Sequence, residues 1–327
     1  MNRNKMLVKL QQFAVQTTLL ESLSDEMKTY YEMTLIDEAQ PKLVHNQFAD
    51  KYPIPKNKTI EFRKYDSLAK ATTPLTEGVT PSGNALNVST ITATIAQYGD
   101  YISMSDLLEM TAIDNNVVQA TKLLGSQAGR TLDSITRDVM AGGTNVIYAG
   151  GKLSRSALTS DDTLKPIYFL QAAAQLETMN ADTIDGSYVA IIHPYAAFDL
   201  MTSPEWVDVH KYADPEAIFN GEIGKLGNVR FVTTSEAKIW KDETCPEGLA
   251  VFGTIVLGAH AYATTELEGG GLRTIIKQLG SSGVADALDQ RSSVGWKHAG
   301  YVSERLVEQY MVRIESTSSY SASASAN

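Results

Sequence analysis

The stretch ATTPLTEGVTPSGNALNVSTITATIAQYGDYISMSD, from Ala71 to Asp106, decides how this chain is interpreted. It is rich in Thr, Ser and Gly, and neither Lys nor Arg occurs from Ala71 to Thr121. The stretch has strand character but few bulky apolar side chains, so it buries too little surface within its own subunit to offset the entropy of ordering it. We therefore predict that another molecule orders it, which favours self-assembly over a self-contained enzyme.

The charge of the chain is negative and uneven. The 327 residues carry a net charge of -10; residues 1–70 hold 11 basic and 9 acidic side chains, whereas residues 71–327 hold 17 and 29. A protein that grips nucleic acid has a concentrated basic face, and this composition predicts none. Contact with DNA is expected to be weak, non-specific and confined to the first ten residues, which contain Arg3, Lys5 and Lys9 but no acid.

Composition also limits the cellular setting. An apolar content of 43% is ordinary for a globular protein of one large or two modest domains. No window approaches the ~20 apolar residues of a membrane helix, and the N-terminus does not resemble a secretory signal. The single cysteine, Cys245, permits no internal disulfide, so we expect a reducing cytosol.

The first part of the chain is predicted to form two arms. Residues 1–55 make an N-terminal arm, with a helix that starts at the capping box Thr18–Glu21. Thr59–Tyr65 alternates apolar and charged residues, which indicates a half-exposed strand. Leu86–Ile95 is also β-prone, so we expect a long two-stranded arm with its tip near Gly83.

The remainder predicts a mixed α+β core. Apolar residues at helical spacing from Asp114 to Gly142 predict a helix of about 26 residues and ~40 Å, long for a globular domain. Asp162 or Thr163 is expected to cap a second helix that has Pro166 in its first turn. Further elements are expected as a strand at Tyr188–Ile192, a short helix at Ala196–Met201, a glycine-rich turn at Gly221–Gly227, and strands at Val229–Val232, Leu249–Leu257, Leu272–Leu279 and Tyr310–Ile314.

No catalytic constellation emerges from the sequence. The five histidines form no paired metal motif, and His193 before Pro194 is interpreted as a strand-end residue bonded to backbone. The pattern from Gly221 to Lys225 lacks the spacing of a phosphate loop. Cys245 has acidic neighbours, which raise a thiol pKa and argue against a nucleophile. The sequence therefore predicts no enzyme, no cofactor and no metal site.

Six motifs, in this order along the chain, carry a resemblance to a known family. They are TPLTEGVTP (Thr73–Pro81), AQYGDYISMSD (Ala96–Asp106), AGRTLD (Ala128–Asp133), IIHP (Ile191–Pro194), GEIGKLGNVRFVTT (Gly221–Thr234) and DALDQRSSVGWKHA (Asp286–Ala299). Together they resemble the tailed-phage major capsid proteins of the Hong Kong phage (Johnson) fold, and most closely the family typified by the phage N-four major capsid protein. The resemblance extends from about Leu35 to Glu315.

The resemblance implies the Hong Kong phage-type capsid fold and a division of the chain into named parts. These are the N-terminal arm (1–55), a strand and extended β-arm (56–106), a peripheral domain (107–185) with its spine helix at 114–140, an axial domain (186–249), returning core strands (250–315) and a low-complexity tail (316–327) that is mobile unless a neighbour holds it.

The resemblance also implies a function. Copies of the chain would form hexamers and pentamers of an icosahedral head around double-stranded DNA, assembled in the cytoplasm of a bacterial host. Expected partners are a separate scaffolding protein, a portal and a decoration protein. Some shells of this fold link covalently through a lysine near the arm tip. This arm tip has none, because no lysine occurs from Ala71 to Thr121, so non-covalent locking is expected.

Charge suggests what the arm meets. Glu77 lies beside Gly78 at a predicted bend, in a segment without a basic residue. We predict that it pairs with a base on the next subunit. The candidate bases are Lys56, Lys58, Arg63 and Lys64 on the preceding strand, and Arg130 and Arg137 on the long helix.

Three other interpretations remain open at this stage. The same fold could build an encapsulin-like cargo compartment. A soluble α/β enzyme would need a converging acid, base or metal set. A tail or portal component would form one ring instead of a closed shell.

Overall fold

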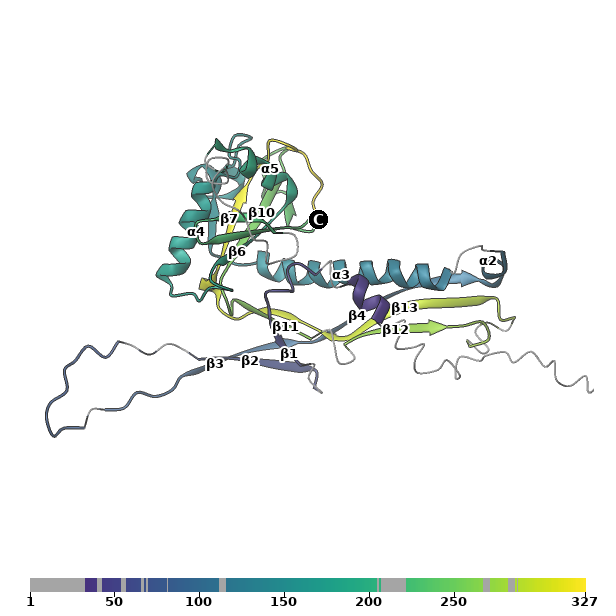
Figure 1. Ribbon diagram of the computed structural model, residues 1–327, viewed down its shortest axis with the longest axis horizontal. Helices are drawn as coiled ribbons and strands as arrows, with labels where there is room; N and C mark the ends of the chain where they lie inside the picture. The colour runs from purple at the N-terminus through teal and green to yellow at the C-terminus, as the bar shows by residue number, and fades with distance from the viewer. Residues whose placement is uncertain are drawn as a thin grey trace, which may run out of the picture.

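The computed structural model shows a chain drawn out in two directions from a globular lobe (Figure 1). A long helix and a narrow sheet run to one side of the lobe, and a two-stranded arm runs to the other. The helix start predicted at Thr18–Glu21 and the basic residues of the first ten positions lie outside the described residues. The structure describes residues 33–39, 43–53, 57–65, 68, 70–80, 82–111, 116–204, 206, 222–266, 271–281, 286 and 288–327.

The arm is the antiparallel pair β2 (Thr59–Tyr65) and β3 (Val88–Thr94). Ile60 and Phe62 are buried in a cluster with Ala93 and Ala263, whereas Glu61 is exposed. The alternation of the sequence therefore correctly predicted this strand and its buried face. The loop between the two strands extends beyond the rest of the molecule.

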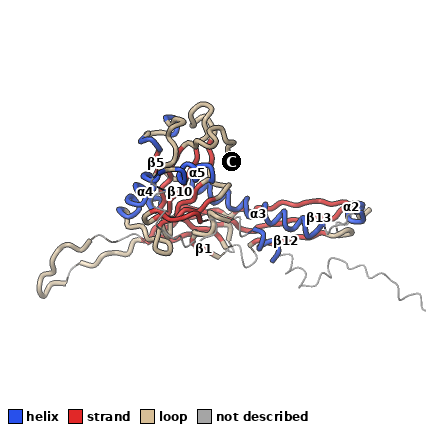
Figure 2. The backbone as a smooth tube through the Cα atoms, turned by 45° about the horizontal axis from the view of Figure 1, so that its top comes forward, coloured by secondary structure: helices blue, strands red, loops and turns tan. Residues whose placement is uncertain are grey.

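A long helix lies on a three-stranded antiparallel sheet, and we call this unit the platform. The helix is α3 (Asn116–Ala141), and Figure 2 shows it running along the sheet. The strands are ordered β12 (Leu272–Lys277), β13 (Arg291–Tyr301) and β4 (Ala96–Ser105). The short helix α2 (Asp106–Thr111) follows β4 at the distal end.

The apolar stripe of α3 is what holds the platform together. Leu124 and Ala128 are buried with Val294 and Trp296 of the sheet. Gly125 allows the helix at residues 33–39 to pack closely, because a Cβ at this position would lie 2.8 Å from a backbone oxygen of that helix. The expected long helix is thus confirmed, although its predicted first residue, Asp114, lies outside the described residues.

The lobe is built on a seven-stranded mixed sheet. Its path is β5 (Val146–Tyr148), β15 (Met311–Ser316), β10 (Val251–Leu257), β6 (Tyr188–Ile192), β8 (Val229–Thr233) and β7 (Glu222–Leu226), and β9 (Ile239–Trp240) pairs with β10. Both faces of this sheet are covered, which explains why every residue of the central strands β6 and β10 is buried.

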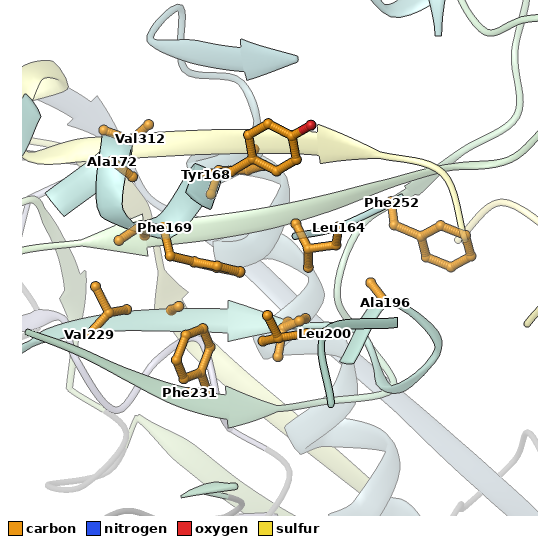
Figure 3. Packing of buried hydrophobic residues seen from close by; sticks show 14 of the residues in the cluster. Leu164, Tyr168, Phe169, Ala172, Ala196, Leu200, Val229, Phe231, Phe252 and Val312 are labelled. Carbon is orange, nitrogen blue, oxygen red and sulfur yellow. The ribbon is translucent and has the colours of Figure 1, made fainter. Parts of the chain in front are cut away.

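Two helices and the end of α3 provide that cover. On one face, α4 (Pro166–Thr178) and α5 (Pro194–Thr202) contribute Phe169 and Leu200, which pack with Phe231 of the sheet (Figure 3). On the other face, Met140 of α3 lies against the sheet. A smaller sheet of β1 (Asp50–Tyr52), β11 (Tyr262–Thr265) and β14 (Ser303–Arg305) connects lobe, arm and platform.

Two local predictions were wrong. Glu222–Leu226 is strand β7, not a turn; it forms a hairpin with β8 that turns at Gly227, where φ is +58°. Neither Asp162 nor Thr163 caps α4, because its N-cap is Lys165. The Asp162 carboxylate instead accepts hydrogen bonds from the backbone amide and hydroxyl of Thr159. Pro166 does occupy the first turn, as expected.

The expected domain boundaries do not coincide with the observed packing. The expected peripheral domain (107–185) and axial domain (186–249) do not form two separate units. Strand β5 and helix α4 of the first range pack in the same lobe as β6 and β8 of the second. The tail also differs from expectation, since its own subunit holds it. Ser319 bonds to the Asp199 carboxylate, and the Asn327 side chain bonds to backbone on both sides of Lys238.

Candidate assembly interface

The tip of the arm makes almost no contact with its own subunit. Every described residue between Leu68 and Val88 is exposed. The exposed side chains include Leu75 at 77%, Val79 at 62% and Leu86 at 68%. Apolar side chains that reach this far into solvent mark a surface that another molecule covers.

A tight turn sits at the centre of the tip. The amide of Val79 donates to the carbonyl of Thr76 at 3.1 Å, and Gly78 has φ +76°. Glycine adopts this left-handed conformation without the cost that a Cβ brings. The turn presents Glu77 to solvent, and this carboxylate has no ion-pair partner in the described part of the chain.

We expect Gly78→Ala to weaken assembly without harming the fold. No atom lies within 4 Å of the added methyl group, so the only cost is the left-handed backbone, about 1–2 kcal/mol. The subunit concentration at which assembly begins, measured by light scattering, should rise roughly tenfold. Gly83→Ala is the matched control, because Gly83 also lies in open space but has no positive φ. Equal thresholds for the two variants would contradict this account.

The basic residues predicted to pair with Glu77 differ in exposure and in the ion pairs they already make. Arg63 is exposed and Lys64 is half-buried on the arm, and neither has an ion pair in the described part of the chain. Lys58 is also exposed, while Lys56 lies outside the described residues. Arg130, 60% exposed, bonds through Nε to the Glu236 carboxylate at 2.7 Å.

Arg137 is committed within its own subunit. Its side chain is 4% exposed, and its guanidinium donates to the Glu236 carbonyl at 2.9 Å and to the Asp138 carboxylate at 3.0 Å. This burial argues against the expectation that Arg137 meets the arm of another copy.

A buried polar network fixes the platform to the segment that precedes β1. The Asp133 carboxylate on α3 accepts from the His45 backbone amide at 2.7 Å, and its second oxygen lies 2.6 Å from His45 Nδ1. Asn46 donates to the Tyr301 hydroxyl at 2.9 Å, which also bonds to Thr136 at 2.6 Å. Satisfied buried networks of this kind make a junction rigid. Nothing in the sequence pattern indicated these residues, because the partners are up to 255 positions apart.

The architecture is similar to that of solved phage capsids. The capsid of Ralstonia phage GP4 matches with a TM-score of 0.64 and 14% identity, over 84% of this chain and 86% of that one. The capsid of cyanophage Pam1 matches with a TM-score of 0.61 and 10% identity, over 85% and 92%. A virus-like particle from Pyrococcus furiosus has a TM-score of 0.52 and 10% identity, over 88% and 99%. At these identities the matches establish the fold alone.

Sequence comparison decides the family. None of the curated proteins compared with the chain matches it. A family model described as phage capsid protein matches residues 88–291, which is more than half of the chain. The chain belongs to the phage capsid protein family. The resemblance drawn from the six sequence motifs is therefore confirmed, and so is the capsid fold.

The structure shows the settings of His193 and Cys245 in this capsid protein. The His193 ring nitrogen Nδ1 accepts from the Tyr195 backbone amide at 3.1 Å, so this residue after β6 bonds to backbone, as the sequence predicted. It is also the N-cap of α5, which the sequence analysis did not predict. Burial raises the pKa of the Cys245 thiol, and the Asp242 carboxylate adds to the effect. Among the described residues, no three potential metal ligands gather. No described helix is long and apolar enough to cross a membrane.

We expect the subunit to lose stability as the pH falls from about 6.5 to about 4. Burial lowers the pKa of both His193 and His298 from 6.5 to about 4. Between these values the unfolded chain binds the protons and the folded chain does not, so the stability present above pH 6.5 is lost on acidification, up to about 3 kcal/mol per histidine. Urea unfolding at several pH values measures how steeply the free energy of unfolding falls with pH. We expect His298→Gln to make this dependence shallower. An unchanged dependence would show that His298 does not contribute to it.

Proposed function

We propose that this capsid protein is the major shell subunit of a tailed phage. Its copies close into hexamers and pentamers, and these build an icosahedral head around double-stranded DNA. One observation carries the proposal: the arm presents Leu75, Val79 and Leu86 to solvent and has no partner for Glu77 within its own described residues. A subunit with this shape reaches its lowest free energy only when a sister copy covers the arm.

The proposal includes how the shell is held and what else takes part. The arm tip contains no lysine from Ala71 onward, so its contacts are non-covalent. The role is structural and not enzymatic. A separate scaffolding protein directs closure, with a portal at one vertex and a decoration protein outside. DNA contacts are weak and non-specific because acids outnumber bases after residue 70.

The test is direct. The full chain is expressed with and without a candidate scaffold and observed by negative-stain electron microscopy, with closed, uniform shells as the expected product. Nuclease-resistant DNA inside particles from infected cells would separate a phage head from a cargo compartment built on the same fold. A monodisperse monomer under every condition would contradict the proposal.

We expect Glu77→Lys to reduce the yield of closed shells. The reversed charge would face the basic partner in every arm contact. One exposed pair contributes only about 0–1 kcal/mol, but the contact recurs around each ring. Glu247→Lys, an exposed change in the lobe, is the matched control and should assemble normally. An unchanged yield of closed shells with Glu77→Lys would contradict the proposed ion pair between Glu77 and a basic residue of a neighbouring copy.

A further inference from the structure

The loop between β8 and β9 joins the lobe to the side of the long helix. The Glu236 carboxylate of this loop accepts a hydrogen bond from Arg130 of α3 at 2.7 Å, and the Glu236 carbonyl accepts one from Arg137 at 2.9 Å. Nζ of Lys238, in the same loop, lies 3.1 Å from the Asp138 carboxylate. One short loop therefore contacts three charged side chains of one helix, and we call this set of contacts the brace.

The brace lies well away from the point where α3 is attached to the lobe. That attachment is at the end of the helix, where the Arg313 guanidinium donates to the carbonyls of Ala141 and Gly143. Arg130 lies about three helical turns before Ala141, or ~16 Å along the helix axis. An attachment at the helix end alone would let the platform tilt against the lobe. A second contact three turns away opposes this movement.

The tail holds the brace loop through Asn327. The tail, drawn in yellow in Figure 1, runs over the lobe and back toward α3. The Asn327 side-chain amide donates to the Ala237 carbonyl at 2.9 Å, and its side-chain oxygen accepts from the Ile239 amide at 2.9 Å. Asparagine suits this position because its side chain carries both a donor and an acceptor. The Asn327 backbone oxygen accepts from Lys238 at 2.7 Å, so this lysine contacts the tail and α3 at once.

The rest of the tail is anchored along its length. Tyr320 packs on Tyr195 with a ring separation of 4.9 Å. The Ala250 amide donates to the Ala322 carbonyl at 2.8 Å, and Ala324 packs against the core of the lobe. A run of small polar residues loses much conformational entropy when it is ordered, and these contacts offset that loss. The tail is therefore a strap that runs from the lobe core to the brace.

We infer that this strap fixes the angle between the lobe and the platform. When Asn327 leaves the loop, Lys238 loses the partner that holds it beside Asp138, and the Ala237–Ile239 backbone loses the bonds that fix its shape. The brace then loosens, and α3 tilts about its attachment at the helix end. The consequence for assembly rests on the proposed shell function: five- and six-membered rings need slightly different subunit shapes, and the strap limits how far the shape varies.

A distance measurement across the brace tests the inference in the unassembled subunit. In the full chain with Cys245→Ser, spin labels are attached at Leu153→Cys in the lobe and at Leu123→Cys on α3, both exposed positions. Double electron–electron resonance should give one narrow distance distribution. Asn327→Ala should roughly double its width, because the released helix samples several angles. Ser325→Ala, an exposed change in the same tail, is the matched control and should leave the width unchanged.

A second variant tests whether the strap acts through the brace. Lys238→Met removes the ammonium group that contacts both the tail and α3, and should broaden the distribution as Asn327→Ala does. Because the two residues act as one unit, the double variant should be no broader than Lys238→Met alone. An unchanged width for Asn327→Ala, or effects that add in the double variant, would overturn the inference and leave the shell function standing.

Assembled particles give the last measurement. Asn327→Ala shells should vary more in diameter than parent shells by cryo-electron microscopy, and Ser325→Ala shells should match the parent. Asn327→Ala shells as uniform as those of the parent would overturn the role of the strap in shell geometry. A parent chain that forms no shell under any condition would overturn the proposed function instead, since the distances in the unassembled subunit test the strap by themselves.

Discussion

Deletion of Thr76–Asn87 leaves a folded, soluble subunit that forms no closed shell. The described residues of this segment are exposed, and the backbone hydrogen bond of its turn joins two of its own residues, Thr76 and Val79. Removing it should change the free energy of unfolding by less than about 0.5 kcal/mol. Assembly, in contrast, loses one contact per subunit around every ring. Circular dichroism with urea unfolding measures the first effect, and electron microscopy with sedimentation measures the second.

Loop shortening needs a control of its own. Replacing Leu75, Val79 and Leu86 by Ser keeps the length of the arm and removes its apolar contacts. We expect this variant to fail in assembly as well. Collapse of the fold on deletion, or normal shells from the deleted chain, would contradict the assignment of the arm.

Glu315→Gln should have the largest effect on stability. Glu315 is fully buried in β15, where both of its oxygens accept from Arg155 at 2.7 Å. Nε of Arg313 lies 2.8 Å from the same carboxylate, and the Arg313 guanidinium also donates to the carbonyls of Ala141 and Gly143, where α3 ends. One carboxylate therefore neutralises two arginines and helps to attach the long helix to the lobe.

The substitution keeps the shape and removes the charge. It leaves two largely buried guanidinium groups without their counter-ion, which costs about 3–5 kcal/mol. Urea unfolding of the arm-deleted subunit, which stays unassembled, gives the free energy. Glu247→Gln makes the same chemical change at an exposed site and should be neutral. If Glu315→Gln lowers the free energy of unfolding by less than about 1 kcal/mol, the cluster of Glu315, Arg155 and Arg313 does not contribute strongly to the stability of the fold.

Elements with one clear periodicity were predictable. Strand β2 alternates, α3 carries a continuous apolar stripe, and β6 is an unbroken apolar run, so each followed from sequence. Strand β13 was missed because Gly295 and Gly300 hide its alternation. Glycines likewise made β7 resemble a turn, although its pairing with β8 holds it extended.

Long-range contacts account for the remaining differences. The Ser/Ala-rich tail resembles a mobile segment, yet Tyr320 packs on Tyr195 with a ring separation of 4.9 Å. In the candidate interface, the turn at Glu77 and Gly78 followed from local sequence. The buried network that joins His45 and Asn46 to the platform did not, because its partners lie up to 255 positions apart and meet only in the fold.

Hydrogen exchange at the arm tests the central claim most directly. Amides of residues 70–80 and 82–87 are compared in the unassembled subunit and in the closed shell, by mass spectrometry of the same peptides. The account predicts rapid exchange in the lone subunit, where these residues lie in solvent, and strong protection in the shell. Equal protection in both states would show that the arm folds on its own body, and would contradict the claim that sister copies complete this protein.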